Sequence, residues 1–180
     1  MKIVLMALAA AFIVACNSNK DAETSIPPKP SSIEAVKQLV KGKKYRTQKV
    51  ATVSPFEMDK EKPYEWMDEM KDTSTFFKKH LADRMKFTLN FVNDTAVMMN
   101  DEEKIINGTY NLDTKTGEEE KEGIKLRISY PDSSMNFPGS TGVMIMTATY
   151  FVAGADEKSI LLETPRSYNN RKVAILLHTE

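Results

Sequence analysis

The sequence predicts a mainly β protein: an eight-stranded antiparallel up-and-down barrel with an N-terminal helix and a helical insertion after the first strand. The clearest evidence is the stretch in which Met85, Phe87, Leu89 and Phe91 alternate with polar residues. A period of two is typical of a strand with one buried face. Similar short runs follow one another to the C-terminus, separated by turn residues, which favours hairpins in meander order. Closing such a sheet into a barrel would remove its exposed edges.

Length and composition limit the functions that this chain can have. The chain has 180 residues, enough for one domain with a sizeable core. Lys plus Arg and Asp plus Glu number 25 each, so no excess of charge favours nucleic acid as a partner. Cys16 is the sole cysteine, which excludes an internal disulfide and a cysteine-rich metal site.

The N-terminus has the features of a secretory signal. Met1-Lys2 precedes an apolar run over 3–15, which is too short to span a bilayer but suits a signal peptide. The run ends in Ile13-Val14-Ala15-Cys16, which resembles the bacterial lipoprotein signal. The resemblance implies removal of residues 1–15 and a lipid on the Cys16 sulfur, which anchors the protein in the cell envelope. Asn17, in place of Asp, favours the outer membrane by the same resemblance.

A tether and a helix follow the lipidation site. The segment 16–32 is polar and proline-rich, which predicts a flexible tether before a domain over 33–180. Ser31 or Ser32 can cap a helix, and Gly42 ends it. Its apolar residues recur at helical spacing, at Ile33, Val36, Leu39 and Val40. This helix is expected to cover one end or edge of the sheet.

The first strand is expected over 44–53, and the helical insertion over about 58–84. Pro63 is placed for a helix start, with Trp66, Met67 and Met70 on one face. A second helical turn begins near Thr73 or Ser74. The insertion packs on the sheet in one interpretation and forms a lid over the barrel mouth in the other.

The remaining strands are expected over 85–92, 96–100, 106–112, 124–130, 143–152, 160–164 and 172–178. Val143–Val152 is apolar on both faces, so a helix must cover its outer face, or that face binds a partner. Gly108 marks either a bend of the barrel wall or a close backbone approach.

Two strand motifs carry a resemblance to a known family. They are Phe87-Thr88-Leu89-Asn90-Phe91 with its Asn-Asp turn, and Asn107-Gly108-Thr109-Tyr110-Asn111-Leu112-Asp113. With them the region 43–180 resembles the lipocalin-like domains of bacterial lipoproteins. The resemblance implies a barrel of the kind that can hold a small ligand. The Gly-x-Trp of the first lipocalin strand is replaced by Gly42-Lys43-Lys44-Tyr45.

The sequence offers no catalytic constellation. His80 and His178 are the only histidines and belong to unrelated elements. Nucleophile-elbow, zinc-protease and phosphate-loop motifs are missing from the sequence. We therefore expect a protein that is not an enzyme, with no catalytic residue, no metal and no cofactor.

Binding is the better hypothesis. We expect a lipid-anchored envelope lipoprotein whose barrel binds a small hydrophobic ligand or lipid, in the interior or at the mouth. The candidate ligand-binding residues are Trp66 on the lid and, on the strands, Phe87, Leu89, Phe91, Met98, Tyr110, Leu126, Ile128 and Tyr150. The alternative is an interaction module with a filled barrel that docks an envelope protein through the insertion and the outer face of Val143–Val152. Strand methionines fit either, because they fill irregular cores and adapt to varied ligands.

Overall fold

The computed structural model describes residues 25–53, 63–70, 75–101, 104–114, 123–132, 143–165 and 172–180. The predicted signal peptide, Cys16 and the first part of the tether lie outside these residues. The helices are α1 (Ile33–Val40) and α2 (Thr75–Arg84). The strands are β1 (Lys44–Val53), β2 (Tyr64–Trp66), β3 (Thr88–Phe91), β4 (Ala96–Asp101), β5 (Lys104–Asp113), β6 (Lys125–Asp132), β7 (Met144–Ala155), β8 (Ser159–Glu163) and β9 (Lys172–Thr179).

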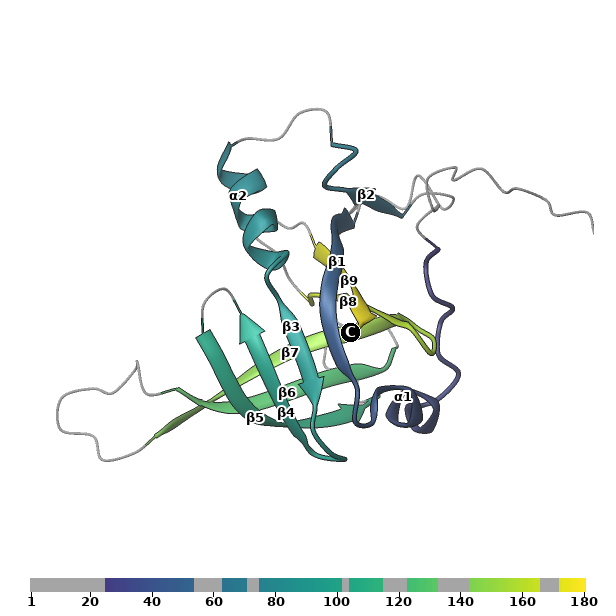
Figure 1. The fold of residues 1–180 in the computed structure, drawn as a ribbon, viewed down its shortest axis with the longest axis vertical. Helices are drawn as coiled ribbons and strands as arrows, with labels where there is room; N and C mark the ends of the chain where they lie inside the picture. The colour runs from purple at the N-terminus through teal and green to yellow at the C-terminus, as the bar shows by residue number, and fades with distance from the viewer. Residues whose placement is uncertain are drawn as a thin grey trace, which may run out of the picture.

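The strands form a closed antiparallel barrel with one extra strand (Figure 1). The order is β1-β3-β4-β5-β6-β7-β8-β9, and the pairing of β1 with β9 closes it. The extra strand β2 pairs with the second half of β1, beyond the part that pairs with β3. The prediction of a mainly β, eight-stranded barrel is confirmed.

The barrel core follows from alternation along each strand. Inward residues of β3, for example, are Leu89 and Phe91, and both are fully buried. On β1 the alternation changes phase at an irregularity between Thr47 and Lys49. This bulge turns Val50 inward and Ala51 outward. The second half of β1 therefore contributes Val50 to the barrel core and Ala51 to a separate apolar cluster on the outer surface.

Helix α1 covers one end of the barrel, as predicted. Ser32 is the N-cap, since its Oγ accepts a hydrogen bond from the Ala35 N–H at 3.1 Å. Gly42 follows the helix with a φ of 66°, a conformation that glycine adopts without strain. Val36 and Val40 belong to the barrel core, so the apolar stripe of α1 packs against the barrel end.

The insertion differs from the prediction. A helix begins only at Thr75, and 63–70 is not helical. Instead Tyr64 and Trp66 alternate with Glu65 in β2, which adds to β1 with Ala51 opposite Trp66. The reason is tertiary: β1 has an unpaired edge beyond β3, and the small Ala51 leaves room for an indole ring beside it. Helix α2 lies at the barrel end remote from α1, and its Leu81 is fully buried in the core (Figure 1).

The last residues of the predicted tether lie against the barrel. Pro27 is buried, and the Ala155 N–H donates a hydrogen bond to the Pro28 carbonyl at 2.9 Å. A Cβ on Gly154 would overlap the Pro27 carbonyl oxygen, so glycine is required for this close approach. Pro27 and Pro28 therefore lie against the C-terminal end of β7, at Gly154 and Ala155.

Candidate functional site

Most of the predicted ligand-binding side chains point into the barrel. Phe87, Leu89, Phe91, Tyr110, Leu126, Ile128 and Tyr150 all belong to the core cluster and are buried. The rings of Phe87 and Tyr150 lie 5.7 Å apart, centroid to centroid. Phe87 directly precedes β3, Tyr150 lies on β7, and these two strands are four steps apart in either direction around the barrel. This contact therefore spans the barrel interior. The barrel interior is therefore filled by side chains at this level.

The α1 end of the interior is held by aromatic rings. Phe91 makes edge-to-face contacts with Tyr45 and Tyr110, with centroid distances of 6.0 Å and 4.9 Å. The Tyr45 hydroxyl donates to the Leu39 carbonyl at 3.1 Å, and the Tyr110 hydroxyl donates to the Asn93 carbonyl at 3.2 Å. Aromatic pairs and satisfied hydroxyls of this kind rigidify a core.

Both tyrosines at this end remain neutral hydrogen-bond donors. Burial raises the pKa of Tyr45 to about 12, and the nearby Asp156 carboxylate adds to the shift. Burial, followed by the charge of Asp94, also raises the pKa of Tyr110. Because a neutral phenol keeps its proton, both donors persist over the whole physiological pH range.

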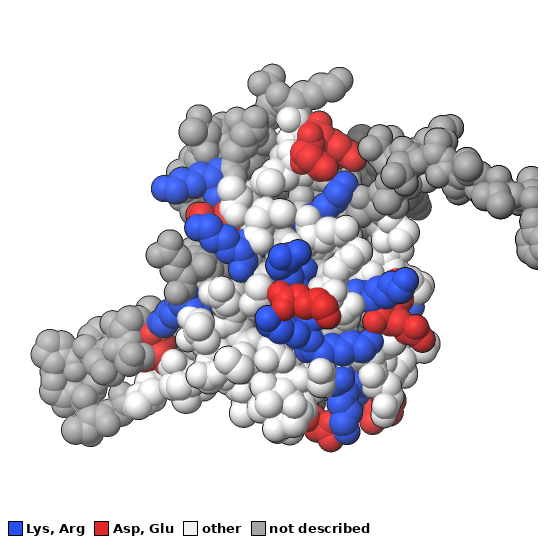
Figure 2. All heavy atoms as spheres, viewed as in Figure 1, with Lys and Arg blue, Asp and Glu red and all other residues white. Residues whose placement is uncertain are grey.

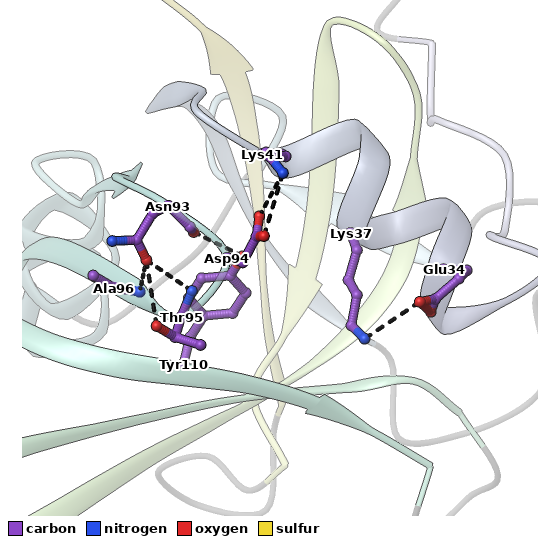
Figure 3. A network of polar contacts seen from close by, with 8 residues as sticks. All are labelled: Glu34, Lys37, Lys41, Asn93, Asp94, Thr95, Ala96 and Tyr110. Atoms are coloured by element: carbon purple, nitrogen blue, oxygen red, sulfur yellow. Dashed lines mark hydrogen bonds and ion pairs between the residues drawn. The ribbon is translucent and has the colours of Figure 1, made fainter.

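The hairpin between β3 and β4 ties this end to α1 (Figure 3). The Asn93 side-chain carbonyl accepts hydrogen bonds from the backbone N–H groups of Thr95 at 2.9 Å and Ala96 at 2.7 Å. Next to it, Asp94 forms an ion pair with Lys41 at 2.9 Å. The pair is exposed and adds little stability, but it places the hairpin beside the end of α1.

The opposite end, named here the α2 end, has a different character. Leu81 and Met70 are buried there, but Met67, Met85, Tyr130 and Ala148 pack only partly buried against the core. Met146 is half-buried and the neighbouring inward position, Met144, is 40% exposed. The apolar interior thus reaches solvent at this end, and an ion pair of Lys104 with Asp132 at 3.4 Å lies beside it.

Met98 was predicted to point inward, and that prediction is wrong. Its side chain is 39% exposed on the outer surface, while Met99 is 1% exposed and belongs to the core. Residues 96–99 read Ala-Val-Met-Met, so both faces of this strand are equally apolar in the sequence. The pairing of Met99 with the inward Leu89 decides the phase.

Trp66 is not on a lid over the mouth. It lies outside the barrel wall in a second apolar cluster with Ala51, Leu161, Ala174 and Leu176. The Lys49 ammonium lies 6.0 Å from its ring, and Tyr64 beside it donates to Glu163 at 2.7 Å. Trp66 therefore covers the outer face of β1 and β9, so its fluorescence would not sense a ligand in the barrel interior.

Sequence reasoning did not assign Tyr130, Met146 and Ala148 to the candidate site. The alternation of apolar residues over 124–130 could have identified Tyr130 as an inward residue. The inward residues of β7 could not be identified in this way, because Val143–Val152 is apolar at odd and even positions alike. The register of β7 with β6, in which Met146 lies opposite Tyr130, identifies the inward set.

The described residues were also compared with the requirements of a metal site, a membrane-spanning helix and a histidine-based site. They contain no group of three His, Cys, Asp or Glu side chains placed to hold a metal. None of the helices in these ranges is long and apolar enough to cross a membrane. His178 lies on β9 opposite Arg46, and the side chain of His80 is outside the described set.

The fold defines a class, a closed eight-stranded antiparallel barrel with a helix over each end. No known protein family matches the chain, and neither curated proteins nor solved structures gave a match.

Proposed function

We propose that this protein is a lipid-anchored envelope lipoprotein whose barrel binds a small apolar ligand, such as an acyl chain, at the α2 end. The observation that supports the proposal is the difference between the two ends. At the α1 end, aromatic contacts and phenol hydrogen bonds fill the interior. At the α2 end, Met85, Tyr130 and Met146 leave apolar surface partly exposed.

The chemistry of the α2 end favours an unbranched apolar ligand over a polar one. Methionine side chains have several rotatable bonds and a polarizable sulfur, so they adjust to a flexible hydrocarbon. Met85, Met144 and Met146 supply such surface at or near this end. The Lys104–Asp132 pair beside it offers a polar rim for a headgroup, in the usual pattern of an apolar site with few polar groups.

Binding of the fluorescent fatty acid cis-parinaric acid tests this proposal. The probe should brighten on binding, and Met146→Gln should weaken its affinity by about tenfold, since it replaces the apolar thioether and methyl group by an amide that must lose its hydration against the acyl chain. Met98→Gln is the matched control. It makes the same chemical change at a methionine on the outer surface, and the affinity should stay at the wild-type value.

Two results would contradict the proposal. One is the absence of any saturable binding by the wild-type protein. The other is an equal loss of affinity in Met146→Gln and Met98→Gln, which would locate the probe on the outer surface.

The anchor is tested separately. The resemblance of residues 13–16 to a lipoprotein signal leads us to propose cleavage before Cys16 and lipidation of its sulfur. Two or more acyl chains give durable membrane attachment. Metabolic labelling with a palmitate analogue should label the wild-type chain in outer-membrane fractions and leave Cys16→Ala unlabelled. A mature protein that still begins at Met1 would remove this part of the proposal.

A second function has its own supporting observation. Ile105, Val143 and Ile145 are 68%, 62% and 62% exposed on the outer side of the β5–β7 region. Exposed aliphatic residues that gather on one surface often mark a protein interface. An interaction module with a filled barrel would use this surface, and Ile105→Lys would then abolish partner capture without affecting probe binding.

A further inference from the structure

Strand β7 is longer than the strand that follows it in the barrel. Its first pair with β8 is Phe151 with Glu163, whereas its pairs with β6 begin at Met144. Residues 144–150 therefore have a strand neighbour on one side only among the described residues. In Figure 1 the paired ends of strands β6 and β7 project beyond the rest of the barrel.

Among the described strands, none pairs with Ile145, Thr147 or Thr149 on the edge of β7 that faces away from β6. Val152 donates its N–H to Ile124 at 2.8 Å, so Val152 faces β6. Successive residues of an antiparallel strand direct these groups to opposite edges. Ile145, Thr147 and Thr149 therefore direct their N–H and C=O groups away from β6, toward the open edge.

Native proteins often protect such an edge with charges, prolines or bulges, and residues 144–150 contain none of these. Residues 144–150 read Met-Ile-Met-Thr-Ala-Thr-Tyr, without charge, proline or glycine. Their register with β6 is continuous, without a bulge. A long, uncharged edge strand of β-forming residues is a template for another strand.

We infer that the open edge of β7 pairs with the same edge of a second copy of this chain, as an antiparallel isologous dimer. A twofold axis at Thr147 places Met146 opposite Ala148 of the second copy and Ile145 opposite its Thr149, so the side chains nearest the axis pair large with small. The same axis places Met144 opposite Tyr150 at the two ends of the paired stretch. Since residues 144–150 carry no charge, two identical edges meet without like-charge repulsion. The two β5–β6–β7 regions would then join into one continuous sheet.

This inference is independent of the proposed ligand. The edge groups of Thr147 lie in the plane of the sheet, and its side chain is on the outer surface, with its hydroxyl 3.3 Å from that of Ser129. Changes at Thr147 therefore affect pairing without touching the inward residues Met146 and Ala148.

Disulfide trapping in intact cells tests the register directly. Two differently tagged full-length chains, one with Ile145→Cys and one with Thr149→Cys, are co-expressed and oxidised. Opposite residues in an antiparallel pair have Cα atoms about 5 Å apart, within disulfide range. We expect a mixed dimer from this pair of variants, and much less product from Ile145→Cys alone. The wild-type chain reports any disulfide through Cys16.

Thr109→Cys is the matched control, because Thr109 is an exposed threonine in the middle of the sheet, on β5. It should give no dimer. In the intact chain without added cysteines, Thr147→Lys should reduce the sedimenting mass in detergent about twofold, because two lysines would meet on the axis. The circular dichroism spectrum of the folded chain should stay unchanged.

Three outcomes would overturn the inference. They are monomers in every variant, equal trapping of Thr109→Cys and the edge pair, and a disulfide from Ile145→Cys to a different protein. The last would assign the edge to a partner strand from another chain.

Discussion

The two ends of the barrel are built on different principles. At the α1 end, large rigid side chains are buried and their polar atoms are hydrogen-bonded, as with Tyr45 and Tyr110. At the α2 end, flexible side chains such as Met85 and Met146 are partly exposed. One fold can therefore place stability at one end and leave the other free to adapt, which is the usual separation between scaffold and binding site.

The largest effect should come from the α1 end. Phe91→Ala removes the ring that joins Tyr45 and Tyr110, in a fully buried position. We expect a loss of about 3–5 kcal/mol in the free energy of unfolding, as for other buried phenylalanines. Chemical denaturation measures it. Met85→Ala, at a partly buried site of the α2 end, should cost much less, and equal losses would contradict the contrast.

A smaller effect on stability is expected at Gly108, where β5 approaches β6 closely beside the α2 end. A Cβ on Gly108 would lie 2.6 Å from the Ser129 carbonyl oxygen and 3.3 Å from the Tyr130 Cβ. Gly108→Ala must therefore shift β6, at a cost of about 1–3 kcal/mol, typical of overpacking. The sequence favoured a bend of the barrel wall over a close approach, whereas the structure shows a close approach to the Ser129 backbone. A thermal unfolding temperature equal to the wild type would refute this reason for the glycine.

Two tyrosines, one at each end of the barrel, allow a matched comparison of what a hydroxyl group contributes to stability. Tyr110→Phe removes a buried donor and leaves the Asn93 carbonyl without it, so we expect a loss of about 1 kcal/mol in the free energy of unfolding. Tyr130→Phe, at the partly exposed α2 end, should leave stability close to the wild type. Reversal of this order in urea denaturation would mean that the α2 end is the more rigid one.

The smallest effect depends on pH. Burial acts to raise the pKa of Asp156, but hydrogen bonds from Lys158 and Ser159 and the charge of His178 outweigh it, so its pKa is lowered. A lowered carboxyl pKa stabilises the fold above the ordinary pKa, and this contribution is lost as pH falls through the folded-state value. Asp156→Asn should therefore lower the unfolding temperature at neutral pH. The difference should shrink as the pH falls through the folded-state pKa, and a difference that does not change with falling pH would contradict the assignment.

These contrasts also show which features could be read from the sequence. Alternation with a period of two located the barrel strands before β7 to within a few residues, because one buried face imposes it. The last three barrel strands were located as short apolar runs between turn residues. A cap at Ser31 or Ser32 and the stop at Gly42 were readable because capping chemistry is local, and the structure uses Ser32. The side of Met98 was not readable, since its strand is apolar on both faces.

By itself, then, the sequence determined the strands, the first helix and the mainly β class, since each depends on neighbours a few residues away. Tertiary structure alone decided that Trp66 joins an outer cluster and that β7 extends beyond β8. Both depend on which edges and faces remain uncovered once distant strands have paired, and no local pattern in the sequence encodes that.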